Sequence, residues 1–147
     1  MHGDTILLVE DNPDDEELTL RALRKSGIKE PVVVAHDGPE ALDYLFGGGN
    51  WKNRDTHDTP RVVLLDLKLP KLSGLDVLRR MREDARTRRV PVVVLTSSTE
   101  ERDIQQCYDL GANSYVRKPV EFDEFLEFIR NLGNYWLKLN ELPRSSR

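Results

Sequence analysis

The sequence predicts an α/β fold in which five strands alternate with five helices, a doubly wound (βα)5 arrangement around one parallel sheet. Five short runs of β-branched and aliphatic residues predict the strands, at residues 6–9, 32–35, 62–65, 92–95 and 114–116. The first, third and fourth runs are continuously apolar instead of alternating, which is typical of parallel strands covered on both faces. At 147 residues the chain has the length of one domain and can bury a core without metal or disulfide support.

The first helix is predicted to begin at Pro13, because Asn12 is a good N-cap and proline fits the first helical position. Four acids follow at residues 14–17, where the helix dipole favours negative charge. That role is sufficient for them, so we assign them no chemistry. Gly27 is expected to close the helix, since glycine is common just past a helix end.

Similar signals predict the other helices. Ser98 and Glu101 have the spacing of a capping box, so the fourth helix is expected to open at Ser98 and to end near Gly111. The second, third and fifth helices are expected near residue 37, after residue 74 and after residue 122. The stretch at 47–60 is predicted to be an enlarged loop before the third strand.

Charge and composition exclude several classes of function. The net charge of −4 provides no basic field, so we expect no nucleic-acid partner. The single cysteine excludes an intrachain disulfide and a cluster of thiolate metal ligands. No apolar run reaches about 18 residues, the length of a membrane span, and the N-terminus lacks a signal-peptide pattern. We therefore expect a soluble, cytoplasmic protein without membrane contact.

Polar side chains stand at the ends of the predicted strands, where function gathers in open α/β sheets. They follow four of the strands: Glu10 and Asp11, Asp66, Thr96 and Ser97, and Lys118. We therefore expect three carboxylates, two hydroxyl groups and one ammonium group to meet at one edge of the sheet.

This combination of groups indicates phosphoryl transfer. Three carboxylates close together repel one another unless a cation offsets their charge, and such oxygen ligands suit Mg²⁺. Lys118 can pair with a carboxylate or a phosphate, and Thr96 and the amides around Ser97 can donate to anionic oxygens. Asp66, at the end of a core strand, is the predicted nucleophile that accepts the phosphoryl group.

Four motifs, in this order and spacing, resemble the receiver domain of two-component response regulators: "LLVEDN", "VVLLDLKLPKLSG", "VVVLTSS" and "SYVRKP". The resemblance covers residues 5 to about 130 and implies a flavodoxin-like receiver fold. It also implies a signalling protein and not an enzyme. Such a single-domain regulator would be phosphorylated by a sensor histidine kinase and would act in a phosphorelay through a change of conformation.

The resemblance implies a metal site and a phosphoacceptor. Asp66 would accept the phosphoryl group and share in binding Mg²⁺, and Asp11 would bind the ion directly. Glu10 would act through a water molecule or by supporting the other ligands, and the backbone carbonyl of Lys68 would be a further ligand. Many receivers carry two aspartates where this chain has Glu10 and Asp11, but an acid pair remains, so we expect function to be retained.

The resemblance also implies groups that bind and sense the phosphoryl group. Thr96 and Lys118 would contact it, together with the backbone at Ser97. Tyr115 occupies the aromatic switch position and would rotate inward as Thr96 moves toward the phosphate. The Lys118–Pro119 peptide bond would be cis.

The C-terminal part leaves two interpretations open. We expect a receiver domain at residues 1–132 and a C-terminal extension of the fifth helix and tail at 133–147. Helical spacing gives one apolar stripe that packs on the sheet and a second without an obvious partner, at Phe128, Leu132, Tyr135 and Leu139. Either the helix stops near Asn131 and the segment after it folds back, or the second stripe forms a homodimer or kinase-facing surface. The long loop and this tail resemble small regulators that partner phytochrome-type kinases.

Particular residues of the sequence disfavour each of three rival functions. An aspartyl-phosphate hydrolase would need a second acid two residues after Asp66, where this chain has Lys68. A flavodoxin-like binding module would need a hydroxyl- and glycine-rich phosphate loop after the first strand, which is acidic here. A degenerate receiver that acts only as a scaffold would have lost part of the site, whereas Asp11, Asp66, Thr96 and Lys118 are all present.

Overall fold

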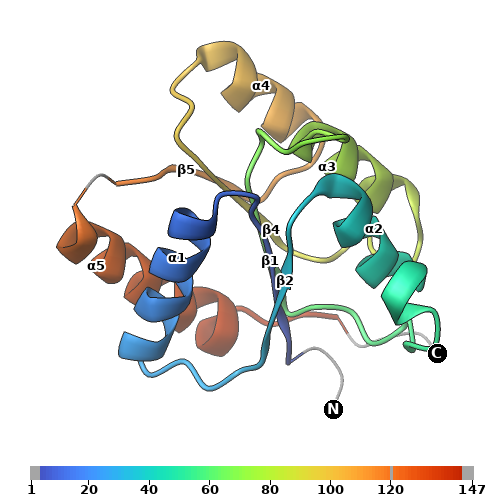
Figure 1. The fold of residues 1–147 in the computed structure, drawn as a ribbon, viewed down its shortest axis with the longest axis horizontal. Helices are drawn as coiled ribbons and strands as arrows, with labels where there is room; N and C mark the ends of the chain where they lie inside the picture. The colour runs from blue at the N-terminus through green and yellow to red at the C-terminus, as the bar shows by residue number, and fades with distance from the viewer. Residues whose placement is uncertain (1–3, 120, 144–147) are drawn as a thin grey trace.

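The computed structural model describes residues 4–119 and 121–143. Its strands form one parallel sheet in the order β2-β1-β3-β4-β5 (Figure 1). They are β1 (Ile6–Val9), β2 (Val32–Ala35), β3 (Val62–Leu65), β4 (Val92–Thr96) and β5 (Ser114–Arg117). The predicted fold class and all five strand positions are confirmed, and β4 and β5 each run one residue further than predicted.

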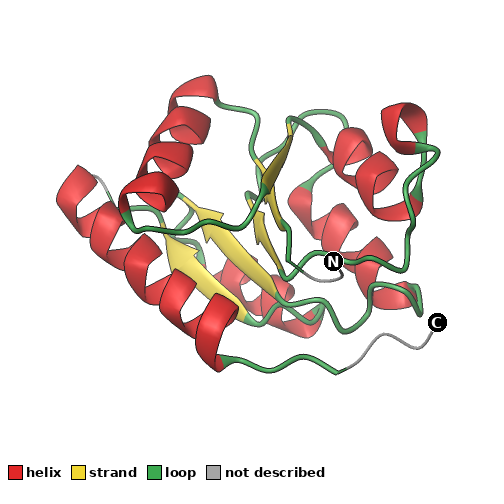
Figure 2. Ribbon diagram, turned by 90° about the horizontal axis from the view of Figure 1, so that it is seen from below, coloured by secondary structure: helices red, strands yellow, loops and turns green. Residues whose placement is uncertain are grey.

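Helices cover both faces of this sheet (Figure 2). They are α1 (Pro13–Lys25), α2 (Gly38–Phe46), α3 (Gly74–Glu83), α4 (Glu101–Asp109) and α5 (Phe122–Gly133). Alternate residues of each strand point to opposite faces, so β1 sends Leu7 toward the core under α2, α3 and α4. It sends Leu8 toward the core under α1 and α5. The sheet is thus doubly wound, and its carboxyl edge is framed by the starts of the helices.

The two predicted helix caps have different outcomes. Asn12 caps α1 as expected, because its side-chain oxygen accepts hydrogen bonds from the backbone amides of Asp14 and Asp15. The capping box at Ser98 was wrong. The residues after β4 remain outside the helix as far as Glu100, which is the N-cap of α4 and makes no side-chain capping hydrogen bond. The Ser98 hydroxyl reaches past the cap to the carboxylate of Asp103, at 2.5 Å.

The loop before β3 is built around Arg54. Its guanidinium group donates hydrogen bonds to the backbone carbonyls of Tyr44, Leu45 and Asp58 and stacks over the Tyr44 ring. The loop also contains a 3₁₀ turn, η1 (Gly49–Trp51), whose Trp51 packs edge-on against Tyr44. This enlarged loop is therefore an ordered cover over the end of α2.

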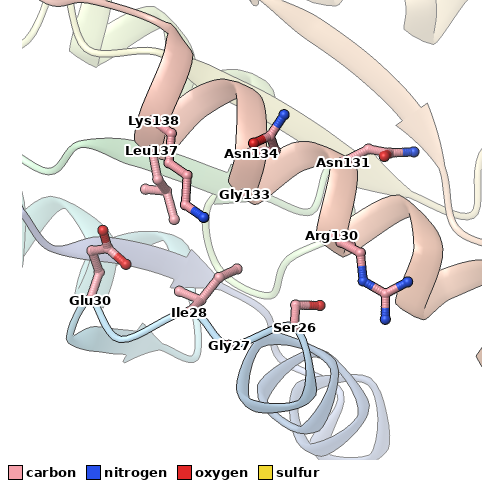
Figure 3. Close-up of a pocket in the computed structure, with 10 residues that line it drawn as sticks. All are labelled: Ser26, Gly27, Ile28, Glu30, Arg130, Asn131, Gly133, Asn134, Leu137 and Lys138. Atoms are coloured by element: carbon pink, nitrogen blue, oxygen red, sulfur yellow. The ribbon is translucent and has the colours of Figure 1, made fainter.

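The fifth helix does not stop near Asn131. It continues past Gly133 as a π-helical segment, η2 (Asn134–Leu139). A side chain at Gly133 would lie about 2.7 Å from Ile28, so glycine permits the close approach of α5 to the loop after α1. Between them lies a groove of about 450 Å³, lined in part by Ile28, Gly133 and Leu137 (Figure 3).

The second apolar stripe is divided between the core and the surface. Phe128 and Leu132 belong to the core under α1 and α5. Tyr135 and Leu139 are exposed, with 49% and 64% of their surface accessible. Arg61, just before β3, donates hydrogen bonds to the carbonyls of Trp136 and Asn140 and so ties η2 to the amino edge of the sheet. Among the described residues, no helix has the length and apolar character needed to cross a membrane.

Candidate functional site

The polar residues that follow the strands meet at the carboxyl edge of the sheet, as predicted. Backbone hydrogen bonds between neighbouring segments continue past the ends of the strands and fix the positions of these residues. The amide of Glu10 donates to Ala35, the amide of Asp66 to Val9, and the amide of Lys118 to Thr96, at 2.8–3.1 Å. These residues therefore leave the sheet side by side.

Three acids form one cluster there. Carboxylate oxygens of Glu10, Asp11 and Asp66 all lie within 4.8 Å of one another. Glu10 and Asp66 are buried, with 2% and 8% of their surface exposed, whereas Asp11 is open to solvent. Hard divalent cations prefer oxygen ligands, and Mg²⁺ keeps several waters when few protein groups hold it. The cluster therefore fits a divalent cation, which would enter from solvent on the side of Asp11.

Lys118 places one positive charge against the cluster. Its Nζ atom lies 2.6 Å from Glu10 Oε1, 3.2 Å from Asp66 Oδ2 and 2.9 Å from Asp15 Oδ2. An ammonium group has three donors, and each of them finds one carboxylate. Asp15 was missed by the sequence analysis, which gave the acids at 14–17 no role beyond the helix start.

Burial and charge shift the ionisation of this pair. Burial raises the pKa of Glu10 to about 7, and the charge of Asp66 adds to the increase, although the hydrogen bond from Lys118 opposes it. Burial alone would lower the pKa of Lys118, but its hydrogen bonds to Glu10 and Asp15 outweigh this effect and raise it. Lys118 thus remains a cation across the physiological range, which is what an anionic ligand requires.

The backbone of Asp66 is tightly packed against the start of α3. Gly74, the first residue of α3, packs directly behind it, and a side chain at Gly74 would collide with the carbonyl oxygen of Asp66 and lie about 2.8 Å from Leu67 Cα. The amide of Gly74 donates to the carbonyl of Leu67, and the amide of Lys68 donates to Asp66 Oδ1 at 3.3 Å. The side chain of Lys68 is exposed beside this site. The carboxylate is therefore held in place from its own backbone.

The hydroxyl residues after β4 take different positions. Thr96 is fully buried, and its Oγ1 atom accepts a hydrogen bond of 3.4 Å from the amide of Ser98. Ser97 is exposed. Ser98 is buried, and the sequence analysis missed its position because only its capping spacing was visible. The loop after β4 is thus linked to α4 through the contact of Ser98 with Asp103.

Tyr115 is linked to the same loop. Its hydroxyl donates a hydrogen bond of 3.0 Å to the carbonyl of Ser98, and burial raises the pKa of this phenol. Thr96, Ser98 and Tyr115 are therefore joined in one chain of hydrogen bonds. The expected cis bond at Lys118–Pro119 was wrong, because no peptide bond in the described ranges is cis. Trans is the intrinsically favoured form of such bonds, by about 0.5–1 kcal/mol.

Known proteins share this arrangement. Residues 6–130 match the response regulator receiver domain family. The methanogenesis regulatory protein FilR2 of Methanothrix harundinacea is 40% identical over 141 residues, which cover 94% of this chain and 86% of FilR2. The phosphorylated cyanobacterial phytochrome response regulator RcpA is 37% identical, with a TM-score of 0.88 over 97% of this chain and 99% of RcpA.

A third relative holds a metal ion. The Mn²⁺-bound form of the response regulator Rcp1, known from Synechocystis, is 33% identical, with a TM-score of 0.86 over 96% of this chain and 99% of Rcp1. The acidic cluster of Glu10, Asp11 and Asp66 offers carboxylate oxygens of the kind that a divalent metal ion binds, in agreement with the cluster expected from the sequence. The match of residues 6–130 to the receiver family identifies a signalling domain. With its sheet order, its acidic cluster and this match over most of its length, the chain belongs to the response regulator receiver domain family.

Proposed function

We propose that Asp66 accepts a phosphoryl group from the histidine of a sensor kinase. An oxygen of Asp66 forms a bond to phosphorus while the bond from phosphorus to the histidine nitrogen breaks, and that nitrogen keeps the electron pair. One observation carries this proposal. Asp66 alone combines a place in the acidic cluster with a contact to Lys118 and a mount fixed by Gly74.

The metal in this reaction would be Mg²⁺, held by Glu10, Asp11, Asp66 and the carbonyl of Lys68. Mg²⁺ supplies charge neutralisation, so that an anionic phosphoryl group can approach a cluster of carboxylates. Asp11 is the exposed member and would bind the ion directly. Glu10 is buried and already paired with Lys118, so it would act through a water molecule or by supporting the other ligands.

The phosphoryl oxygens would be received by Lys118, by the hydroxyl of Thr96 and by the backbone at Ser97. Lys118 is placed for this role, because it already donates to the oxygen of Asp66 at 3.2 Å. To reach the phosphoryl group, the hydroxyl of Thr96 gives up its contact with the amide of Ser98. Because Ser98 also accepts from Tyr115, this shift would release Tyr115 and change the surface formed by α4 and β5.

The kinase is proposed to be of the phytochrome type, in the cytoplasm. RcpA, whose solved form is phosphorylated, is a phytochrome response regulator that aligns with nearly all of this chain. The likeness to FilR2, which is named as a methanogenesis regulatory protein, supports a competing proposal, a kinase that is not of the phytochrome type. Phosphotransfer from a panel of purified kinases separates the two, because the cognate kinase transfers fastest. Preferred transfer from a kinase without a photosensor would contradict the phytochrome assignment.

We propose that residues 133–147 are a C-terminal extension and that the exposed part of the second stripe, Tyr135 and Leu139, forms a homodimer surface. Tyr135 and Leu139 supply exposed apolar surface on η2, and the ring of Tyr135 packs edge-on against Trp136. Light scattering at micromolar concentration should give a dimer, and Leu139→Glu should give a monomer. A monomeric protein both with and without phosphorylation would contradict this assignment.

Labelling by a small phosphodonor tests the central proposal. Acetyl phosphate with Mg²⁺ should add one phosphoryl group to the protein, detected by mass spectrometry, and Asp66→Asn should remove the label. Asp76→Asn is the matched control, since Asp76 is an acid in the first turn of α3 that contacts Ser73 and Arg79 instead of Lys118. A label that persists in Asp66→Asn would place the acceptor elsewhere, and an unlabelled wild type would support the scaffold alternative.

A further inference from the structure

Asp15 differs from the other carboxylates around Lys118. Glu10 and Asp66 belong to the acidic cluster, so both have a divalent cation as a second possible partner. Asp15 comes from the first turn of α1 and lies outside that cluster. Its contact with Lys118, at 2.9 Å, joins two segments that are 103 residues apart in the sequence. This contact can therefore persist when the partners of Glu10 and Asp66 change.

The local structure of α1 directs Asp15 toward the site. Its amide is held by the side chain of Asn12, and its carbonyl accepts a hydrogen bond from the hydroxyl of Thr19. Thr19, Ala22 and Leu23 are the buried residues of α1, and Asp15 lies four residues before Thr19 on the same helical stripe. Asp14 has the same charge and is capped by the same Asn12, but it is exposed and outside this stripe.

The charges of the three acceptors explain what Asp15 would do. A cation in the cluster would compete with Lys118 for the carboxylate of Glu10, because both are positively charged. A phosphoryl group on Asp66 would make one carboxylate oxygen the bridging oxygen of a mixed anhydride, which is a weaker hydrogen-bond acceptor than a carboxylate oxygen. Lys118 then has Asp15 as its remaining full carboxylate partner. The ammonium group of a lysine lies at the end of a flexible four-carbon chain. A carboxylate that stays hydrogen-bonded to it would restrict the positions that the ammonium group can take.

We propose that Asp15 is a positioning residue that holds the ammonium group of Lys118 over Asp66 while a phosphoryl group is received. This inference rests on the proposed function of Asp66. It assigns to the start of α1 a part in phosphorylation that goes beyond capping the helix. Asp15 would act through Lys118, since it lies outside the acidic cluster and contacts the lysine.

Two variants and one control test this role in the full chain. Asp15→Ala removes the contact, Asp15→Glu restores a carboxylate, and Asp14→Ala removes an equal charge from the same helical turn. Each variant is first checked for an unchanged fold by its amide NMR spectrum. The rate of labelling by acetyl phosphate is then measured at saturating Mg²⁺ over a range of donor concentrations.

We expect Asp15→Ala to label about two- to fivefold more slowly at saturating donor, the range for a partly exposed ion pair. Asp14→Ala should label as the wild type does, and Asp15→Glu should recover most of the rate. Asp15 carries negative charge near an anionic donor, so a variant that labels faster would mean that it acts only by repulsion. Faster labelling, or an equal loss in Asp14→Ala, would overturn the inference.

A second measurement does not depend on labelling. The ¹⁵N-detected signal of the Lys118 ammonium group reports how fast its protons exchange with water. We expect exchange to become several times faster in Asp15→Ala and to stay unchanged in Asp14→Ala. If the wild type took no label, the proposed function would fail, and this signal would still decide whether Asp15 holds Lys118. An unchanged signal in Asp15→Ala would refute the positioning role.

Discussion

Gly74 packs against the backbone of Asp66 so closely that no side chain fits between them. The residue that starts α3 is thus the support of the proposed phosphoacceptor. The contact is to backbone atoms, which cannot rotate away as the end of a side chain can. Changes at Gly74 should therefore act on the whole carboxyl edge of the sheet.

The variant Gly74→Ala should lower the free energy of unfolding by about 1–3 kcal/mol, the cost of overpacking a well-packed site. It should also slow labelling of Asp66, because either the strand or α3 must shift. Urea denaturation measures the first effect and acetyl phosphate labelling the second. Gly48→Ala is the control, since a side chain there meets the flexible carboxylate of Asp43. An equal cost at both positions would contradict the role given to the backbone of Asp66.

The raised pKa of Glu10 predicts a pH dependence of stability. The folded protein binds the proton of Glu10 more tightly than the unfolded chain does, since the pKa rises from 4.5 to about 7. Stability relative to a Glu10→Gln variant should therefore fall as the pH rises from about 4.5 to about 7, and then level off. Urea denaturation in the presence of a chelator measures this difference. Added Mg²⁺ should reduce the fall, because a bound cation favours the ionised carboxylate.

The hydrogen bond from Tyr115 to Ser98 should stabilise the loop after β4. Tyr115→Phe removes the hydroxyl and should cost about 0.5–1.5 kcal/mol of unfolding free energy. Amide hydrogen exchange in the first turn of α4 should become faster, since Ser98 also holds Asp103. Tyr108→Phe serves as the control, because Tyr108 is half exposed on α4. Unchanged exchange in Tyr115→Phe would show that this bond does not restrain α4.

The hydrogen bonds of Arg54 should stabilise the long loop before β3. Arg54→Lys keeps the charge but cannot donate to several carbonyls of the end of α2 at once, as the guanidinium group does. We expect the free energy of unfolding to fall by about 1.5–3 kcal/mol, the range for hydrogen bonds made by charged groups. Thermal unfolding measures this loss, with Lys52→Arg at an exposed neighbouring position as the control. A loss no greater than that of the control would mean that the loop is held by Trp51 and its other contacts.

Local patterns in the sequence were sufficient for the fold. The strands follow from aliphatic runs, and the start of α1 follows from Asn12 and Pro13, because each signal lies within a few residues of its effect. The convergence of Glu10, Asp11, Asp66 and Lys118 followed from one further rule, that parallel strands end at the same edge. Most of the site could thus be predicted without coordinates.

Tertiary contacts decided the rest. Ser98 has capping spacing, but its hydroxyl donates to the partly buried carboxylate of Asp103, and the helix begins only after Glu100. Asp15 looks like any acid at a helix start, and only Lys118, far away in the sequence, distinguishes it from Asp14. The one local hint was the stripe that ends in Thr19 and Leu23, which places Asp15 on the inner face of α1.

The hydrogen bonds from Arg61 to the carbonyls of Trp136 and Asn140 determine where a label on the C-terminal segment would lie. They anchor η2 where β3 begins, whereas Asp66 stands where β3 finishes. A dye or affinity handle attached near Leu139 would therefore lie at the opposite end of β3 from the acidic cluster, and it would cover part of the proposed dimer surface. Such a label would leave the carboxyl end of β3, where a phosphodonor or kinase must reach Asp66, uncovered.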